Sequence, residues 1–203
     1  MKQTKQGRGF TLLELLIVIA IIAILSVILV LVLNPAETLK KSRDAQRISD
    51  LSTVKTALGL YMTATSSPFL GSATANTACA NTLFYSQTGP SGTVGSLTKQ
   101  GTASTTVDGL GWIPVNLDSL TGGSPLSNFP LDPSNTVAGT GSSTDLVYRY
   151  ACKASPLSFE LNATLESAAY TSEDNKLTKD GGNNLALYEV GTDLTILPST
   201  SDF

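Results

Sequence analysis

The sequence predicts an α+β fold, in which one long N-terminal helix packs through its second half on a small antiparallel sheet. Three features of the 203-residue chain lead to this prediction. Residues 10–33 form an almost unbroken apolar run, residues 34–66 continue with helical spacing, and residues 145–203 contain short runs of alternating apolar and polar residues. A helix, a loop and then several strands form the element order of an α+β domain.

The apolar run FTLLELLIVIAIIAILSVILVLVL covers residues 10–33, and its polar side chains are Thr11, Glu14 and Ser26. As a helix, this segment spans roughly 36 Å, and the hydrocarbon core of a bilayer is about 30 Å thick. A secretory signal peptide has a shorter apolar core and ends at a small-residue cleavage site, which does not follow Leu33. We therefore interpret residues 10–33 as a transmembrane segment that stays in an apolar environment.

Glu14 is the unexpected residue of this segment, because an unpaired carboxylate inside a membrane helix costs about 3 kcal/mol. Two interpretations are open. Either Glu14 lies close enough to the membrane surface to reach the headgroups, or it awaits a positive partner. No other charged residue lies between Phe10 and Leu33, so that partner must be the chain's own amino terminus or another subunit.

The residues around Glu14 resemble a known signal. GRGFTLLE at residues 7–14, after a leader with Lys2 and Lys5, is similar to the prepilin signal of the type IV pilin superfamily, which includes type II secretion and competence pseudopilins. The resemblance implies that residues 1–9 are a leader, cut between Gly9 and Phe10 by a membrane-embedded prepilin peptidase. It also implies N-methylation of Phe10.

In this superfamily, the acidic residue at the position of Glu14 is thought to neutralise the Phe10 amine of a neighbouring subunit during assembly. The leader remains cytoplasmic, so the resemblance implies a single-pass cytoplasmic membrane protein with an extracytoplasmic body. After assembly the subunits form an extracellular or periplasmic filament. The implied partners are further copies of the chain, the prepilin peptidase and the inner-membrane platform of the assembly machine.

Residues 34–66 predict an amphipathic continuation of the helix to about Thr65. The apolar residues of its predicted inner face recur at spacings of three and four: Ile48, Leu51, Val54, Leu58 and Tyr61. Charged residues occupy the opposite face, where they can pair weakly: Lys41, Asp44, Arg47, Asp50 and Lys55. Pro35 is expected to kink or open the helix at the junction. Since residues 10–33 contain no Pro or Gly, any loosening of the helix is expected at Asn34–Pro35.

Residues 67–144 are rich in Gly, Ser, Thr, Asn and Pro and predict a long loop between helix and sheet. Three apolar islands, at residues 83–85, 111–115 and 129–133, are expected to anchor this loop on the core. Trp112 is interpreted as a core residue. Pro-Leu-Asp-Pro at residues 130–133 resembles an Asp-Pro sequence of secretion pseudopilins.

Strand patterns begin after residue 145. Residues 146–152 and 157–165 alternate between apolar and polar side chains, and the turn at Lys153–Pro156 predicts an antiparallel hairpin. Shorter strands are predicted at about residues 185–190 and 193–197. These elements form the predicted C-terminal sheet of residues 145–203.

Cys79 and Cys152 are the two cysteines of the chain. If the body lies outside the cytoplasm, its environment is oxidising, and we expect a disulfide between them. The alternative is a pair of buried free thiols.

A loop at residues 172–184, SEDNKLTKDGGNN, concentrates oxygen ligands of the kind that Ca²⁺ prefers. The candidate calcium ligands are Asp174, Asp180, Asn183 and Asn184, and Glu173 and Asn175 lie in the same loop. The spacing is not that of an EF-hand, and Gly181-Gly182 first of all indicates a simple turn. Calcium in a late loop is also a property of major secretion pseudopilins, so the resemblance adds support to a calcium site without replacing the interpretation as a turn. No other cofactor is expected.

The composition of the chain argues against sites built on histidine, against a Cys-rich zinc site and against nucleic-acid binding. The chain contains no histidine, which removes the commonest general base and metal ligand, and two cysteines cannot form a Cys-rich zinc site. Residues 56–203 hold five Lys and Arg against twelve Asp and Glu, an acidic balance that argues against nucleic-acid binding. No active site is predicted.

The sequence therefore predicts a structural subunit of a type IV pilus-like filament. One alternative is the major pseudopilin of a type II secretion or DNA-uptake machine. Another is a membrane-anchored binding domain or adhesin that does not polymerise.

Overall fold

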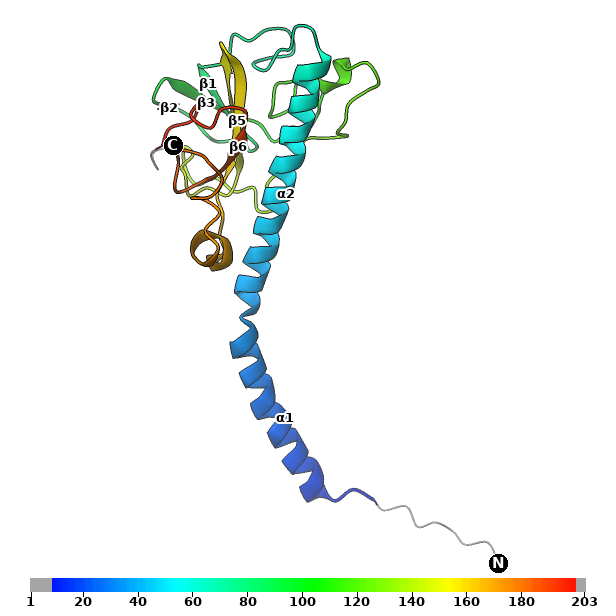
Figure 1. The fold of residues 1–203 in the computed structure, drawn as a ribbon. Helices are drawn as coiled ribbons and strands as arrows, with labels where there is room; N and C mark the ends of the chain where they lie inside the picture. The colour runs from blue at the N-terminus through cyan, green and yellow to red at the C-terminus, as the bar shows by residue number, and fades with distance from the viewer. Residues whose placement is uncertain (1–8, 200–203) are drawn as a thin grey trace, which may run out of the picture. The chain divides into compact units, whose positions relative to one another are not determined.

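The computed structural model describes residues 9–199, and the leader positions up to Arg8 lie outside the described residues. The chain divides into two units, with the boundary between Leu39 and Lys40. Figure 1 shows helices α1 and α2 and the sheet strands.

The first unit contains α1, Leu12–Leu33, and the start of α2, Pro35–Ala64. The sequence predicted one helix with a kink or opening at Pro35, and the structure has two helices separated by Asn34. Asn34 adopts the left-handed conformation, with φ 38° and ψ 71°. A residue before proline is disfavoured in the helical region, and asparagine tolerates the left-handed one.

Asn34 also begins the next helix. Its carbonyl oxygen accepts hydrogen bonds from the N–H groups of Glu37 and Thr38, at 3.1 and 3.2 Å. Pro35 takes the first helical position, where its missing N–H breaks no helical hydrogen bond. The interruption is therefore capped from within the chain.

In the second unit, α2 buries the predicted apolar stripe. Leu51, Val54, Leu58 and Tyr61 are buried, and Ile48 is half-buried. The predicted charged face is wrong in part, because Asp44 and Arg47 are fully buried rather than solvent-exposed. Their burial follows from tertiary ion pairs that helical spacing does not reveal.

The sheet has six strands in the order β2-β3-β1-β4-β5-β6. Three come from the segment predicted as a loop: β1 Thr82–Tyr85, β2 Thr93–Val94 and β3 Leu97–Gly101. The sheet is larger than the predicted antiparallel one and is mixed, because these strands join it and β1 pairs with β3 in parallel. These strands are only two to five residues long, so alternation did not identify them.

The C-terminal strands are β4 Tyr148–Ala154, β5 Leu157–Ala163 and β6 Tyr188–Gly191. The predicted β4–β5 hairpin is confirmed, with Tyr150 opposite Leu161 and Cys152 opposite Phe159. β6 corresponds to the strand expected near residues 185–190. The strand predicted at residues 193–197 is a turn region instead. Two short helical turns, η1 Leu117–Ser119 and η2 Ala169–Glu173, lie in the connections.

The core lies between α2 and one face of the sheet. The α2 stripe joins Tyr150, Phe159 and Leu161 in one cluster, together with side chains of the long connection. Trp112, fully buried, belongs to this cluster, and its Nε1–H donates to the carbonyl oxygen of Pro130 at 3.0 Å. The three apolar islands therefore anchor the connection as predicted.

The other face of the sheet is also covered. Tyr85, Val147 and Ala151 form a second apolar cluster with Leu187 and Leu197 from the C-terminal segment. We refer to this side as the second face of the sheet. Because both faces of the sheet are covered, β4 and β5 are buried along nearly their whole length.

Candidate functional site

The predicted cleavage point lies just before the first helix. Gly9, Phe10 and Thr11 are outside any helix or strand, and α1 begins at Leu12. The side chain of Phe10 is 85% exposed, and among the described residues, apart from the chain neighbours of Gly9, no atom lies within 4 Å of a Cβ placed at Gly9. The Gly9–Phe10 peptide bond is therefore unobstructed and non-helical, which is what a protease needs at the bond it cuts.

Thr11 and Glu14 form a capping box at the start of α1. Oε2 of Glu14 accepts hydrogen bonds from the backbone N–H and the hydroxyl of Thr11, each at 3.1 Å. In return, the N–H of Glu14 donates to the Thr11 hydroxyl at 3.2 Å. The Glu14 carboxylate is thus held by its own helix start, where the helix dipole favours a negative charge.

Thr11 is the partner that sequence reasoning missed. The sequence predicted a positive partner for Glu14, namely the amino terminus or another subunit. The spacing of Thr11 and Glu14 is that of a capping box ahead of an apolar helix, so the signal was present.

The surface of α1 is apolar and uncovered. Its described large apolar side chains are all exposed, and the least exposed, Val18, is 47% exposed. Ser26 donates its hydroxyl hydrogen to the carbonyl oxygen of Ile22 at 2.7 Å, so its polarity is satisfied within the helix. Among the described residues, one helical stretch is long and apolar enough to cross a membrane by length and composition.

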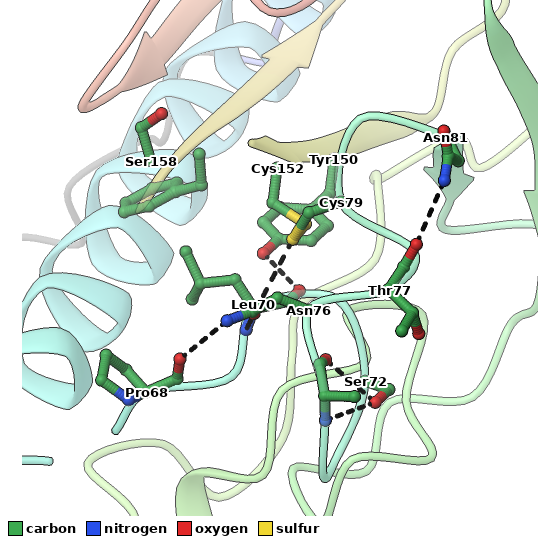
Figure 2. The surroundings of a disulfide bond; sticks show 12 residues. Pro68, Leu70, Ser72, Asn76, Thr77, Cys79, Asn81, Tyr150, Cys152 and Ser158 are labelled. Atoms are coloured by element: carbon green, nitrogen blue, oxygen red, sulfur yellow. Dashed lines mark hydrogen bonds between the residues drawn. A yellow bond between two sulfur atoms is a disulfide. The ribbon is translucent and has the colours of Figure 1, made fainter. Parts of the chain in front are cut away.

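The predicted disulfide between Cys79 and Cys152 is present, with 4.6 Å between the Cα atoms (Figure 2). It joins the segment before β1 to β4. Both cysteines are buried, and the N–H of Ala80 donates to the Cys152 carbonyl oxygen at 2.6 Å. Beside the bridge, the hydroxyl of Tyr150 donates to the carbonyl oxygen of Leu70 at 2.8 Å. The bridge therefore fixes the start of the long connection on the sheet.

A second group of buried polar residues surrounds Arg47 of α2. Its guanidinium donates to both carboxylate oxygens of Asp132, at 2.6 and 2.9 Å, and to Asp44 and Glu166, at 2.8 and 2.6 Å. Arg43 adds a 2.6 Å ion pair to Glu166. We refer to these five residues as the Arg47 cluster.

The Arg47 cluster connects three parts of the body. Asp44 also accepts the N–H groups of Glu166 and Ser167, and Asp132 accepts those of Ser134 and Asn135. α2, the long connection and the segment after β5 therefore meet at one buried guanidinium. Asp132 is the acid of the Pro-Leu-Asp-Pro sequence, so that resemblance falls on a residue whose role in the structure is to hold α2.

The candidate calcium ligands are distributed over two places. Asp174 is engaged by Lys176 and Lys179, at 2.5 and 2.6 Å. Asp180 and Asn184 lie in the turn before β6, where Asp180 accepts the N–H groups of Gly182 and Glu189, each at 2.9 Å.

Asn184 donates to the Pro198 carbonyl oxygen at 2.9 Å, and Asn183 donates to that of Leu197 at 3.4 Å. Within residues 9–199, no three acidic or cysteine side chains are grouped closely enough to hold a metal ion. Calcium binding stays a prediction, and the function proposed below does not use it.

The comparison with protein families identifies the signal at the start of α1. Residues 4–30 match the family described as the prokaryotic N-terminal methylation motif, which is the prepilin signal of type IV pilins and pseudopilins. No curated protein and no solved structure matches the chain. The matched residues include Gly9, Phe10 and Glu14.

Proposed function

From the premise that the chain carries a prepilin signal and is pilin-like, we propose that it is a structural subunit of a type IV pilus-like filament. In this proposal, prepilin peptidase cuts between Gly9 and Phe10, and Phe10 is N-methylated. The mature subunit then polymerises through α1. The observation that carries the proposal is the position of Glu14, a single carboxylate at the start of an exposed apolar helix.

Cleavage creates the positive charge that the helix otherwise lacks. The new amine belongs to Phe10, directly before the helix cap at Thr11. Within one subunit, the capping box keeps the Glu14 carboxylate hydrogen-bonded, which lowers the cost of placing it in a membrane. During assembly, Glu14 exchanges these bonds for the Phe10 amine of a neighbouring subunit. In the new bond both the amine and the carboxylate are charged, whereas only the carboxylate is charged in the bonds that it replaces.

The apolar surface of α1 then needs a new environment outside the membrane. Twenty-two residues form a helix of about 33 Å, which matches the hydrocarbon thickness of a bilayer. In a filament, the packed α1 helices of many subunits take the place of lipid. Because exposure of this surface to water is unfavourable, the subunit is expected to leave the membrane only by joining the filament.

The location follows from the same steps. Before assembly the protein is a single-pass protein of the cytoplasmic membrane with its body on the extracytoplasmic side. Its partners are the prepilin peptidase, further copies of itself and the inner-membrane platform of an assembly machine. The Cys79–Cys152 disulfide supports an oxidising compartment for the body.

Two other functions share this helix. A major pseudopilin of a type II secretion or DNA-uptake machine would use the same processing and packing in a shorter filament. A membrane-anchored binding domain or adhesin would keep α1 in lipid and have no need for Glu14 to meet a second subunit.

The test compares Glu14→Ala with Ser26→Ala, which changes the other polar side chain within α1. We expect Glu14→Ala to insert in the membrane and lose its leader, yet to form no filaments when sheared surface fractions are examined by electron microscopy. Ser26→Ala is expected to assemble. Normal filaments from Glu14→Ala would contradict the charge-neutralisation step, and an absence of filaments from the unchanged chain would favour the anchored binding domain.

A further inference from the structure

Tyr170 brings together two lysines from distant parts of the chain. It lies in η2, whereas Lys41 lies on α2 and Lys176 follows η2. The ammonium groups of the two lysines are each 5.9 Å from the centroid of the Tyr170 ring, within the range of a cation–π contact. Lys41 is exposed, and Tyr170 and Lys176 are half-buried. The three side chains therefore form one surface where α2 meets the segment after β5.

Buried hydrogen bonds hold this surface in place. The N–H groups of Glu166 and Ser167 donate to the buried carboxylate of Asp44, at 3.0 and 2.7 Å. The carbonyl oxygen of Ser167 in turn accepts the N–H of Tyr170 at 3.2 Å. The position of the Tyr170 ring beside Lys41 is thus set by the contact with Asp44 rather than by the two lysines.

Most of the exposed cations of the body lie at this end of it. Of the 13 Lys and Arg residues of the chain, three belong to the leader, and three others are buried. Lys55 lies about 21 Å further along α2 than Lys41, and Lys153 pairs with Asp193 in the C-terminal segment. We refer to the remaining five cations as the basic end of the body: Lys40, Lys41, Arg43, Lys176 and Lys179.

The charge of Lys41 is the one that an outside anion can meet. Other cations of the basic end are paired, since Arg43 contacts Glu166, and Lys176 and Lys179 both contact Asp174. The contact that the structure gives Lys41 is instead with an uncharged ring. Counted together, the five cations exceed the four carboxylates near them by one: Glu37, Glu166, Glu173 and Asp174.

Lys41 also lies close to the end of the apolar helix. It is the eighth residue after Leu33, where α1 ends, and α2 rises about 9 Å from Pro35 to Lys41. The headgroup layer adds about 5–7 Å to each side of the hydrocarbon. Side chains of a helix point back towards its N-terminus, and lysine carries its charge on a long apolar stem. The Lys41 ammonium can therefore reach the headgroups.

We propose that, while α1 is in the membrane, Lys41, Tyr170 and Lys176 bind the phosphate groups of anionic phospholipids at the outer membrane–water boundary. This rests on the proposed function, because α1 must span the membrane and the body must lie outside the cytoplasm. Tyrosine favours the headgroup region, and basic residues beside a membrane segment are attracted to anionic lipid.

The charge distribution of the body gives this contact one orientation. Residues 56–203 hold five Lys and Arg against twelve Asp and Glu, so the remaining surface of the body is acidic. Anionic headgroups attract the basic end and repel the rest. The contact therefore determines which end of the body rests on the membrane before the subunit enters a filament.

The experiment uses the full chain in nanodiscs of phosphatidylcholine, with or without phosphatidylglycerol. A water-soluble reagent acetylates exposed lysines, and mass spectrometry gives the rate at each one. Phosphatidylglycerol is expected to slow acetylation of Lys41 and Lys176 about fivefold, since one lysine at an anionic membrane surface contributes a factor of that order. Lys55 and Lys153 are internal controls, and their rates are expected to stay unchanged. Salt at about 1 M is expected to remove the difference, because it screens charges beyond about 3 Å.

Variants locate the contact on η2. Lys41→Gln with Lys176→Gln removes the two charges beside Tyr170, and Lys55→Gln with Lys153→Gln removes two charges elsewhere. Hydrogen exchange of residues 168–173 reports whether η2 lies on the membrane. Phosphatidylglycerol is expected to slow this exchange in the unchanged chain and in the control pair, but not in the first pair.

Three results would overturn the proposal. One is an equal acetylation rate of Lys41 in the two kinds of disc. Another is full protection of Lys41 by inorganic phosphate in phosphatidylcholine discs, which would indicate a site for a free anion. The third is protection only in discs that hold two copies of the chain, which would make a second copy the partner.

Glu14→Ala separates this proposal from that of the filament. The variant is expected to keep the lipid protection of Lys41, because contact with headgroups needs no assembly. Lipid protection without filaments from the unchanged chain would contradict the filament alone. Filaments without lipid protection would contradict the lipid contact alone.

Discussion

Arg47 of α2 forms a two-point ion pair with Asp132, with its Nε 2.6 Å from Oδ2 and its Nη2 2.9 Å from Oδ1. The two residues lie 85 positions apart in the chain, and both side chains are fully buried. This pair ties α2 to the long connection between helix and sheet. Displacement of α2 from the sheet would separate the charge of Arg47 from that of Asp132.

Removal of Arg47 is therefore expected to be strongly destabilising. Arg47→Ala leaves Asp132 and Asp44 buried without their guanidinium, and breaking one side of a buried ion pair costs roughly 3–5 kcal/mol. Arg43→Ala is the control, because Arg43 is partly exposed and its pair with Glu166 contributes at most about 1 kcal/mol. Urea denaturation of the two variants measures the difference. Equal losses for both would contradict the central position of Arg47.

The Arg47 cluster also predicts an acid-sensitive component of stability. The hydrogen bond from Arg43, together with that from Arg47, lowers the pKa of Glu166 to about 2. Since the unshifted value is 4.5, the stabilising contribution of Glu166 is complete above that pH and is lost as pH falls through about 2. Glu166→Gln is expected to be less stable than the unchanged chain at neutral pH and to show a weaker loss between pH 4.5 and 2. Thermal unfolding as a function of pH tests this, and parallel profiles would contradict it.

The disulfide is expected to contribute substantially to the stability of the body. Closing a loop with a sequence separation of 73 stabilises a fold by about 4 kcal/mol in the chain-entropy treatment. Cys79→Ala with Cys152→Ala is expected to lower the denaturation midpoint, and reductant is expected to lower that of the unchanged chain but not that of the double variant. Mass spectrometry after alkylation without reductant checks the bond directly. Two alkylated thiols in that sample would show that the bridge does not form.

The capping role of Thr11 predicts that the stability of the first turn of α1 can be lowered without loss of filament assembly. Thr11→Val removes the hydroxyl that caps α1, and loss of an N-cap costs about 1 kcal/mol, or about fivefold in local opening. We expect faster amide exchange at the first turn of α1, with leader removal unchanged. Since Glu14 is still present, filaments are expected to form. Loss of filaments in Thr11→Val would mean that the capping box itself is needed for assembly.

Gly9 predicts a steric requirement at the cut. Gly9→Val places a branched side chain beside the peptide bond that the peptidase must bind in extended form, so the uncleaved chain is expected to accumulate in the membrane. Gly59→Ala, a glycine change in α2 where a Cβ meets no atom within 4 Å, is the control and is expected to be processed normally. Gel mobility of the membrane fraction distinguishes the two forms. Normal processing of Gly9→Val would contradict the assignment of the cleavage site to the Gly9–Phe10 bond.

The N-terminal part of this protein could be predicted from sequence because its information is local. A run of apolar residues, one carboxylate at a set distance from Gly9 and Phe10, and Pro35 after Asn34 are all readable along the chain. The same holds for the β4–β5 hairpin, where alternation and a nearby turn specify the register, and for the pairing of the only two cysteines. The capping box of Thr11 and Glu14 was equally local, although it was overlooked.

Tertiary structure decided the features that depend on partners far apart in the chain. The parallel pairing of β1 with β3 and the burial of Arg47 among Asp132 and Glu166 leave no periodic trace in the sequence. The sequence does not show whether a charged residue is solvated or buried beside a distant partner. Apolar periodicity reports burial against one surface, but buried ion pairs form only when two distant segments are brought together in a medium that excludes water.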